Sequence, residues 1–83
     1  MNYFVYILKC ADGSFYTGIA KDLKKRIKQH NGLLKGGAIY TQNKNPVELK
    51  YFEEHKTRSL ALKREYEIKQ MTRENKQKLF LKD

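Results

Sequence analysis

The sequence contains a single cysteine, Cys10, and only two histidines, which stand far apart in the chain. One cysteine excludes an internal disulfide, and two separated histidines do not form the His and Cys pattern of a zinc site. No apolar stretch approaches the length of a membrane span, and the apolar N-terminal run alternates like a strand and lacks the features of a signal peptide. These absences lead us to expect a cytoplasmic protein with no membrane association.

Acidic residues are also scarce, since nine Asp and Glu face eighteen Lys and Arg, for a formal net charge of +9 over 83 residues. Such a field attracts polyanions, with nucleic acid the first candidate and an anionic membrane surface the second. A solvated basic surface that only confers solubility is the alternative, and it explains the size of the imbalance less well. The length predicts one domain spanning residues 1–83.

Two tyrosine-bearing tripeptides, Phe-Val-Tyr at residues 4–6 and Tyr-Thr-Gly at residues 16–18, flank a turn-forming segment at residues 11–13. They are predicted to form a β-hairpin. A two-residue turn would put Tyr6 and Tyr16 on opposite faces of it. A three-residue loop with Gly13 in the left-handed conformation would instead place both phenols on one face, with Tyr6 opposite the open space at Gly18. Tyrosine is a good strand former, so the hairpin alone favours a packing role.

The remaining pattern predicts an α+β fold, with a three-stranded antiparallel sheet flanked by helices. Asp22 is expected to cap a short helix that stops at Asn31. The loop that follows, residues 32–46, is of a length that is usually functional or disordered. Strands are predicted at residues 3–9, 15–20 and 47–54. In the last of them, Val47, Leu49 and Tyr51 alternate with Glu48, Lys50 and Phe52. Two further helices are predicted at about residues 58–70, capped by Thr57 or Ser59, and at about residues 73–81, capped by Thr72.

Three polar side chains in these helices suggest chemistry. Arg26 and His30 lie four residues apart, so they project from the same side of their helix. Arg26 can hold a phosphate with two prongs, and His30 titrates near neutrality; an exposed basic residue and a helix C-terminal cap are the alternatives. Glu65 falls on the apolar stripe of Ala61 and Ile68, where a carboxylate needs a cationic partner, either a metal ion or a nearby basic side chain.

Together these residues resemble the GIY-YIG nuclease superfamily, most closely its small stand-alone bacterial members of the UPF0213 type. The resemblance runs from Tyr3 to about Lys76. Both tyrosines and Gly18 are kept, although Phe and Val stand where the first family tripeptide has Gly and Ile, and Thr17 stands for the Ile of the second. The segment at residues 61–65, Ala-Leu-Lys-Arg-Glu, matches the family's Ala-Leu-x-x-Glu.

The resemblance implies a divalent-metal-dependent nuclease that hydrolyses phosphodiester bonds in DNA, in repair or recombination. It assigns Glu65 as the ligand of Mg²⁺ or Mn²⁺ and Arg26 as the group that steadies the scissile phosphate. Magnesium commonly takes only one or two protein carboxylates, so a single glutamate is sufficient. Tyr6 is assigned as the base or water-orienting group, supported by Tyr16 and His30.

Further residues are expected to contact the nucleic acid. Lys69 lies one turn beyond Glu65, and an ion pair between the two is the alternative. A nucleic-acid-binding module with little turnover and an interaction subunit of a larger complex remain competing functions, because the chain has no separate target-binding domain. The residues expected to bind nucleic acid are Gly18, Lys24, Lys25, Tyr40, Thr41 and Lys69.

Overall fold

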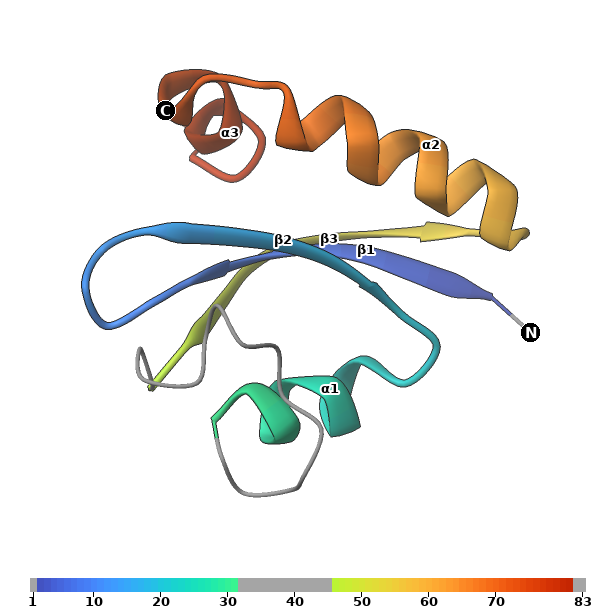
Figure 1. Cartoon of the computed structure of the whole chain (residues 1–83), viewed down its shortest axis with the longest axis horizontal. Helices are drawn as coiled ribbons and strands as arrows, with labels where there is room; N and C mark the ends of the chain where they lie inside the picture. Colours follow the sequence, from blue (N-terminus) through green and yellow to red (C-terminus); the bar gives the residue numbers. More distant parts are fainter. Residues whose placement is uncertain (1, 32–45, 82–83) are drawn as a thin grey trace.

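The computed structural model of the chain describes residues 2–31 and 46–81 (Figure 1). Tyr40 and Thr41, two of the residues expected to contact nucleic acid, lie outside these described residues. The described elements, in chain order, are β1 (Tyr3–Lys9), β2 (Phe15–Ala20), α1 (Leu23–His30), β3 (Glu48–His55), α2 (Arg58–Lys69) and α3 (Arg73–Lys78).

The three strands form one antiparallel sheet in the order β2-β1-β3, so the first strand of the chain lies in the middle. Helices α2 and α3 cover one face of the sheet, and α1 lies against the other (Figure 1). The expected α+β fold is therefore confirmed. No helix within the described ranges combines the length and apolar character that a membrane span requires.

The hairpin of β1 and β2 has the three-residue loop that brings both tyrosines to one face. Gly13 has a φ of +87°, a conformation that favours glycine, and its N–H donates to the Cys10 carbonyl at 2.9 Å. The Cys10 N–H in turn donates to the Ser14 carbonyl at 2.8 Å. Tyr6 then pairs with Gly18, and Tyr16 pairs with Leu8.

Strand β3 does not alternate as the sequence predicted. Its pairing with β1 shifts between Ile7 and Leu8, which face Tyr51 and Leu49, so Lys50 is the extra residue of a bulge. Leu49 therefore packs on the α1 face, whereas Tyr51 packs on the α2 face. The strict alternation of residues 47–52 was wrong because one inserted residue reverses the faces beyond it.

The predicted caps begin all three helices. The side chains of Asp22, Thr57 and Thr72 each accept a hydrogen bond from the backbone N–H three residues later, at 3.0, 3.1 and 3.1 Å. The third helix is shorter than expected. It ends at Lys78, because the next turn tightens to a hydrogen bond from the Leu79 N–H to the Lys76 carbonyl.

The core consists of two clusters, one on each face of β1. Val5 and Ile7 pack with Ala61 and Ile68 of α2. Tyr6, Leu8, Cys10 and Val47 pack against α1 on the other face. Because β1 is buried on both sides, Tyr6 is held in the interior of the protein although it carries a hydroxyl group.

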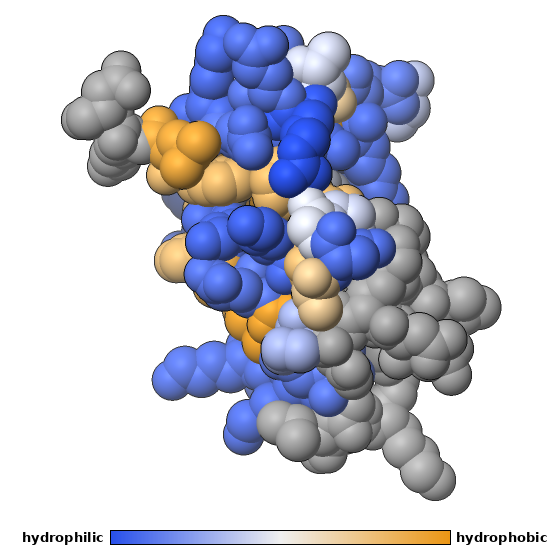
Figure 2. All heavy atoms as spheres, turned by 90° about the vertical axis from the view of Figure 1, so that its left-hand side faces the viewer, coloured by the Kyte–Doolittle hydropathy of each residue, from blue (hydrophilic) through white to orange (hydrophobic). Residues whose placement is uncertain are grey.

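Helix α3 is fastened to the turn of the hairpin. The Arg73 guanidinium lies 4.2 Å from the centre of the Phe15 ring, and its Nη1 donates to the Gly13 carbonyl at 2.8 Å. Figure 2 shows the left-hand side of the view in Figure 1, and the described surface in it is mostly hydrophilic with scattered apolar side chains.

Candidate active site

The centre of the candidate site is a hydrogen bond between a strand and a helix. Tyr6 comes from β1 and His30 is the last residue of α1, and both are fully buried. The Tyr6 hydroxyl and His30 Nε2 are 2.9 Å apart. The helix therefore ends with its histidine turned into the sheet, and Asn31 takes the capping position expected for His30 as an alternative.

Tyr16 completes a group of three rings on this face. Its ring centre lies 6.3 Å from that of Tyr6 and 4.9 Å from that of His30. The space at Gly18 is filled, contrary to expectation: a Cβ atom there would lie 2.5 Å from the Tyr6 hydroxyl oxygen and 2.9 Å from Cε2 of Tyr16. Gly18 is thus the residue that lets both phenols approach the backbone of β2.

Arg26 lies one turn before His30 and donates a hydrogen bond to the Tyr6 hydroxyl. Its Nη1 also donates to Gln29 Oε1 at 2.9 Å. The guanidinium borders a cavity of about 240 Å³ at the junction of β2 and α1, which Lys25 and Gln29 also line. Arg26 is therefore half-buried beside the phenol yet open to a ligand, and Gln29 is a residue of this site that the sequence did not indicate.

The pKa values of the buried pair move in opposite directions. Burial raises the pKa of Tyr6 to about 12, and the hydrogen bond from Arg26 only partly opposes this effect. Burial and, to a smaller extent, the positive charge of Arg26 together lower the pKa of His30 to about 4. His30 is consequently neutral at neutral pH, so the expectation that it titrates near neutrality was wrong. A neutral imidazole can accept the Tyr6 proton at Nε2.

Glu65 approaches the site from α2, on the opposite face of the sheet. Its neighbour Arg64 points to Glu53 of β3. Arg64 and Glu65 therefore lie at the two edges of the apolar stripe formed by Ala61 and Ile68. Its side chain is only 16% exposed, as its place on that stripe predicted, and its charge raises the pKa of Tyr6. The carboxylate is therefore within electrostatic reach of the phenol.

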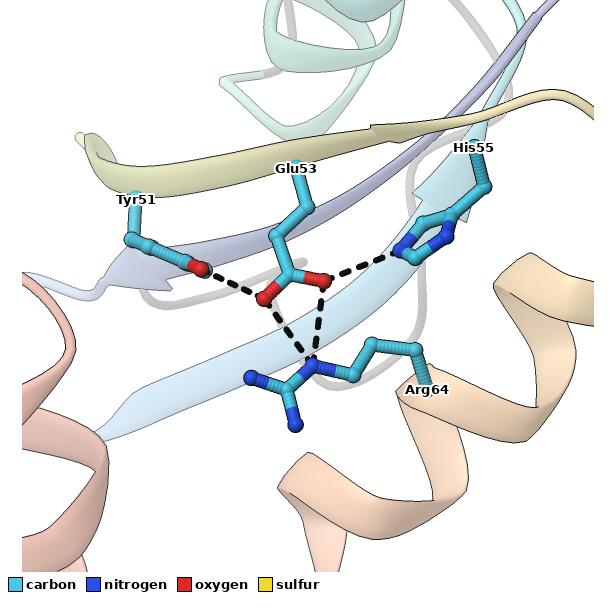
Figure 3. Close-up of polar contacts among 4 residues, drawn as sticks. All are labelled: Tyr51, Glu53, His55 and Arg64. Carbon is cyan, nitrogen blue, oxygen red and sulfur yellow. Dashed lines mark hydrogen bonds and ion pairs between the residues drawn. The ribbon is translucent and has the colours of Figure 1, made fainter.

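A second polar cluster, between β3 and α2, holds Arg64 against the sheet and so sets how α2 is rotated (Figure 3). The sequence did not indicate this cluster. Glu53 accepts hydrogen bonds from Arg64 Nε at 2.9 and 3.0 Å and from the Tyr51 hydroxyl, and it lies 2.9 Å from His55 Nε2. Burial would raise the pKa of Glu53, but these partners outweigh it and lower the pKa. The sequence could have indicated this cluster, because Tyr51, Glu53 and His55 are spaced two residues apart along β3 and therefore lie on one face of the strand.

The expected basic contacts are not all at one place. Lys25 lines the Arg26 cavity, whereas Lys24 borders a separate groove between α1 and β3. Lys69 forms the alternative ion pair, with its ammonium 3.5 Å from Glu65, and its side chain is 51% exposed. An ammonium that is half in solvent can leave the carboxylate when another cation or a phosphate arrives.

The magnesium ion that the resemblance implies would need few protein ligands at this site. Within the described residues, no three His, Cys, Asp or Glu side chains gather into a metal-binding group. Magnesium retains several waters and uses one or two carboxylates together with substrate phosphate oxygens. Glu65, half-buried and paired only with a half-exposed lysine in the contacts described above, fits that need.

Comparison with known proteins places this geometry in a family. The family model described as the GIY-YIG catalytic domain matches residues 2–78. The chain therefore belongs to the GIY-YIG family, a nuclease-type family, as the sequence indicated.

Its relatives are small proteins of similar length. UPF0213 protein SAV0488 of Staphylococcus aureus strain Mu50 is 54% identical over 79 residues, which cover 94% of this chain and 93% of that protein. The solution structure of the UPF0213 protein BH0048 from Bacillus halodurans matches with a TM-score of 0.60 and 42% identity, covering 95% of this chain and 82% of that one. The protein EF2693 from E. faecalis matches with a TM-score of 0.64 and 36% identity, covering 94% and 81%.

Proposed function

We propose that this protein is a divalent-metal-dependent nuclease that hydrolyses phosphodiester bonds in DNA, an activity suited to DNA repair or recombination. The observation that carries the proposal is the buried Tyr6 hydroxyl, which lies between a neutral imidazole and a guanidinium. A phenol needed only for packing would not require both partners. Glu65, acting on the same phenol from α2, supplies the negative charge that a metal ion needs.

In this proposal the residues divide the work of hydrolysis. Arg26 binds a non-bridging oxygen of the scissile phosphate and neutralises the charge that develops there. Glu65 would hold a magnesium or manganese ion, whose chemistry is to polarise the phosphate and acidify a bound water. Tyr6 takes a proton from the attacking water, whose oxygen forms the new bond to phosphorus, while one ester P–O bond breaks and its oxygen leaves.

His30 allows Tyr6 to act without a free phenolate. The phenol passes its own proton to Nε2 as it receives one from water. Burial raises the pKa of Tyr6 and lowers that of His30, so the resting pair keeps the proton on Tyr6. The transfer therefore depends on bound phosphate, whose negative charge favours a charged imidazole. Catalysis is confined in this way to the loaded site.

The test is the substitution Glu65→Gln, with Glu67→Gln as the matched control. Both remove one carboxylate from α2, but Glu67 is exposed and lies away from the apolar stripe. We expect Glu65→Gln to abolish magnesium-dependent cleavage of DNA and to leave DNA binding and Tm nearly unchanged, because the amide keeps the shape and loses the charge. Cleavage by Glu65→Gln at the wild-type rate, or a loss that follows the folded fraction, would contradict the proposal.

A nucleic-acid-binding module with little turnover is the second candidate, and the high pKa of Tyr6 favours it. In that case Tyr6→Phe would change neither binding nor any residual cleavage. The nuclease proposal instead requires Tyr6→Phe to reduce the cleavage rate of the folded protein by about 10²-fold or more. The variant should also lose about 1–3 kcal/mol of stability, because the buried His30 Nε2 loses its partner. Measuring both rates and DNA affinity on one preparation separates the two functions.

A further inference from the structure

A groove on the α1 side of the sheet lies next to the Arg26 cavity and has no part in the chemistry above. It has a volume of about 530 Å³, within the range of about 300–1,000 Å³ typical of small-ligand sites. Its walls come from β1, α1 and β3, and their apolar side chains are Phe4, Leu23, Ile27, Leu49 and Phe52.

Of the two aromatic side chains of this groove, Phe52 is open to solvent and Phe4 is half-buried. Phe52 is 52% exposed, although it stands directly across the sheet from the buried Tyr6. Phe4 packs against it edge to face, with ring centres 5.9 Å apart and the planes at 63°. The two rings therefore present aromatic surface to solvent on the same face as the candidate active site.

The charges around the groove favour an anion-bearing ligand. Lys21 and Lys24 line it, and both are exposed. Asp22 also lines it, but its carboxylate is engaged with the N–H of Lys25 at the start of α1. An aromatic floor with lysines at its margin is the combination that binds single-stranded nucleic acid, where bases stack on rings and phosphates meet the cations.

The groove adjoins the Arg26 cavity. Lys21 and Asp22 line both depressions. Two neighbouring faces of helix α1 line these depressions: Leu23 and Ile27 line the groove, and Arg26 lines the Arg26 cavity. A strand whose phosphate is bound by Arg26 can therefore enter the groove with an adjacent nucleotide.

We propose that this groove receives an unpaired base of the nucleic acid whose phosphate is held at Arg26, with the base stacked on Phe52. The inference rests on the proposed function, because it takes the Arg26 cavity as the phosphate site. It assigns the substrate class as single-stranded nucleic acid, or a duplex carrying an unpaired base beside the cleaved bond. A fully paired duplex keeps its bases stacked inside the helix and leaves the groove empty.

The test compares Phe52→Ala with Tyr66→Ala, which removes another exposed aromatic side chain, 67% exposed, from α2. Affinities are measured by fluorescence anisotropy, with a chelator present to prevent cleavage, for a labelled oligothymidylate and for a fully paired duplex of equal length. Stacking contributes about 1–3 kcal/mol per base. Phe52→Ala should therefore weaken oligothymidylate binding by about 5- to 150-fold and leave duplex affinity unchanged, whereas Tyr66→Ala should change neither.

Further measurements keep the outcomes distinct. The Tm of Phe52→Ala, and the more conservative Phe52→Leu, show whether any loss comes from unfolding, and upfield shifts of the Phe52 ring protons on adding oligothymidylate report stacking directly. Equal affinities of Phe52→Ala and wild type for the oligonucleotide would overturn the groove assignment, even if cleavage depends on Glu65 as proposed. Unchanged affinities together with a wild-type dimer that Phe52→Ala converts to a monomer would assign the groove to a second copy of the chain. If Phe52→Ala selectively loses oligonucleotide binding but the wild-type protein cleaves no DNA with magnesium present, the groove assignment is supported and the nuclease proposal is refuted.

Discussion

Acidification should destabilise this protein through one buried side chain, His30. The ring is 1% exposed, and its pKa is about 4 in the folded protein against an ordinary value of 6.5. Between these values the unfolded chain binds a proton that the folded chain does not, so the free energy of unfolding falls as the pH drops from about 6.5 toward 4. The loss is about 2 kcal/mol at pH 5 and about 3 kcal/mol at pH 4, relative to neutral pH.

Urea denaturation of wild type and His30→Gln at pH 7.5, 6, 5 and 4 measures this loss. Carboxylates titrate in both proteins, so the difference between the two curves isolates the histidine. We expect wild type to lose about 3 kcal/mol more than the variant between pH 7.5 and pH 4, whatever their difference at pH 7.5. The m-values should stay equal, which shows that the surface exposed on unfolding is unchanged.

Parallel curves for the two proteins would refute the reasoning, because they would mean that His30 has the same pKa in both states. The proton resonances of the His30 ring give a direct check, since their titration midpoint should lie near pH 4. Cleavage by the folded protein should fail only as the pH approaches 4, because His30 is protonated there and can no longer accept the Tyr6 proton at Nε2.

Two further substitutions test the packing around the site. Gly18→Ala places a methyl group against the Tyr6 hydroxyl, so it should cost about 1–3 kcal/mol of stability and lower the cleavage rate of the folded protein. Gly13→Ala, whose methyl group meets no atom but strains the turn, should lower stability only. Equal specific activities of the two variants in a cleavage assay would argue against a close fit at Gly18. Glu53→Gln should lower the free energy of unfolding at pH 7 by about 1–3 kcal/mol, and Glu48→Gln, which removes an exposed carboxylate, should lower it less. The difference between the two variants should vanish as the pH falls through the lowered folded-state pKa of Glu53. A difference that persists in acid would show that the charge is not responsible.

Much of this fold could be predicted because it depends on local signals. Asp22, Thr57 and Thr72 mark the helix starts through hydrogen bonds that span three residues. The hairpin register follows from one loop, because Gly13 adopts its positive φ within a segment of five residues. The shared face of Tyr6 and Tyr16 is a consequence of that register alone.

The parts that could not be predicted depend on residues distant in sequence. The bulge at Lys50 is a matter of pairing with β1, and no residue type near it requires a bulge. The low pKa of His30 comes from burial against the sheet and from Arg26, and sequence spacing does not report burial. Glu53 acquires Arg64 only when α2 packs on β3, so a strand position that the sequence suggests is exposed becomes a half-buried ionic contact.

The first strand of the chain is the central strand of the sheet, and this order governs when the protein can fold during synthesis. The hairpin of β1 and β2 emerges first, but an isolated two-stranded hairpin is marginally stable in water. The other side of β1 waits for β3, whose pairing joins Tyr3 to His55, and its core face waits for Ala61 and Ile68 of α2. Folding on the ribosome is thus delayed until α2 has left the exit tunnel, and Glu65, the proposed metal ligand, arrives in the same helix that completes the core.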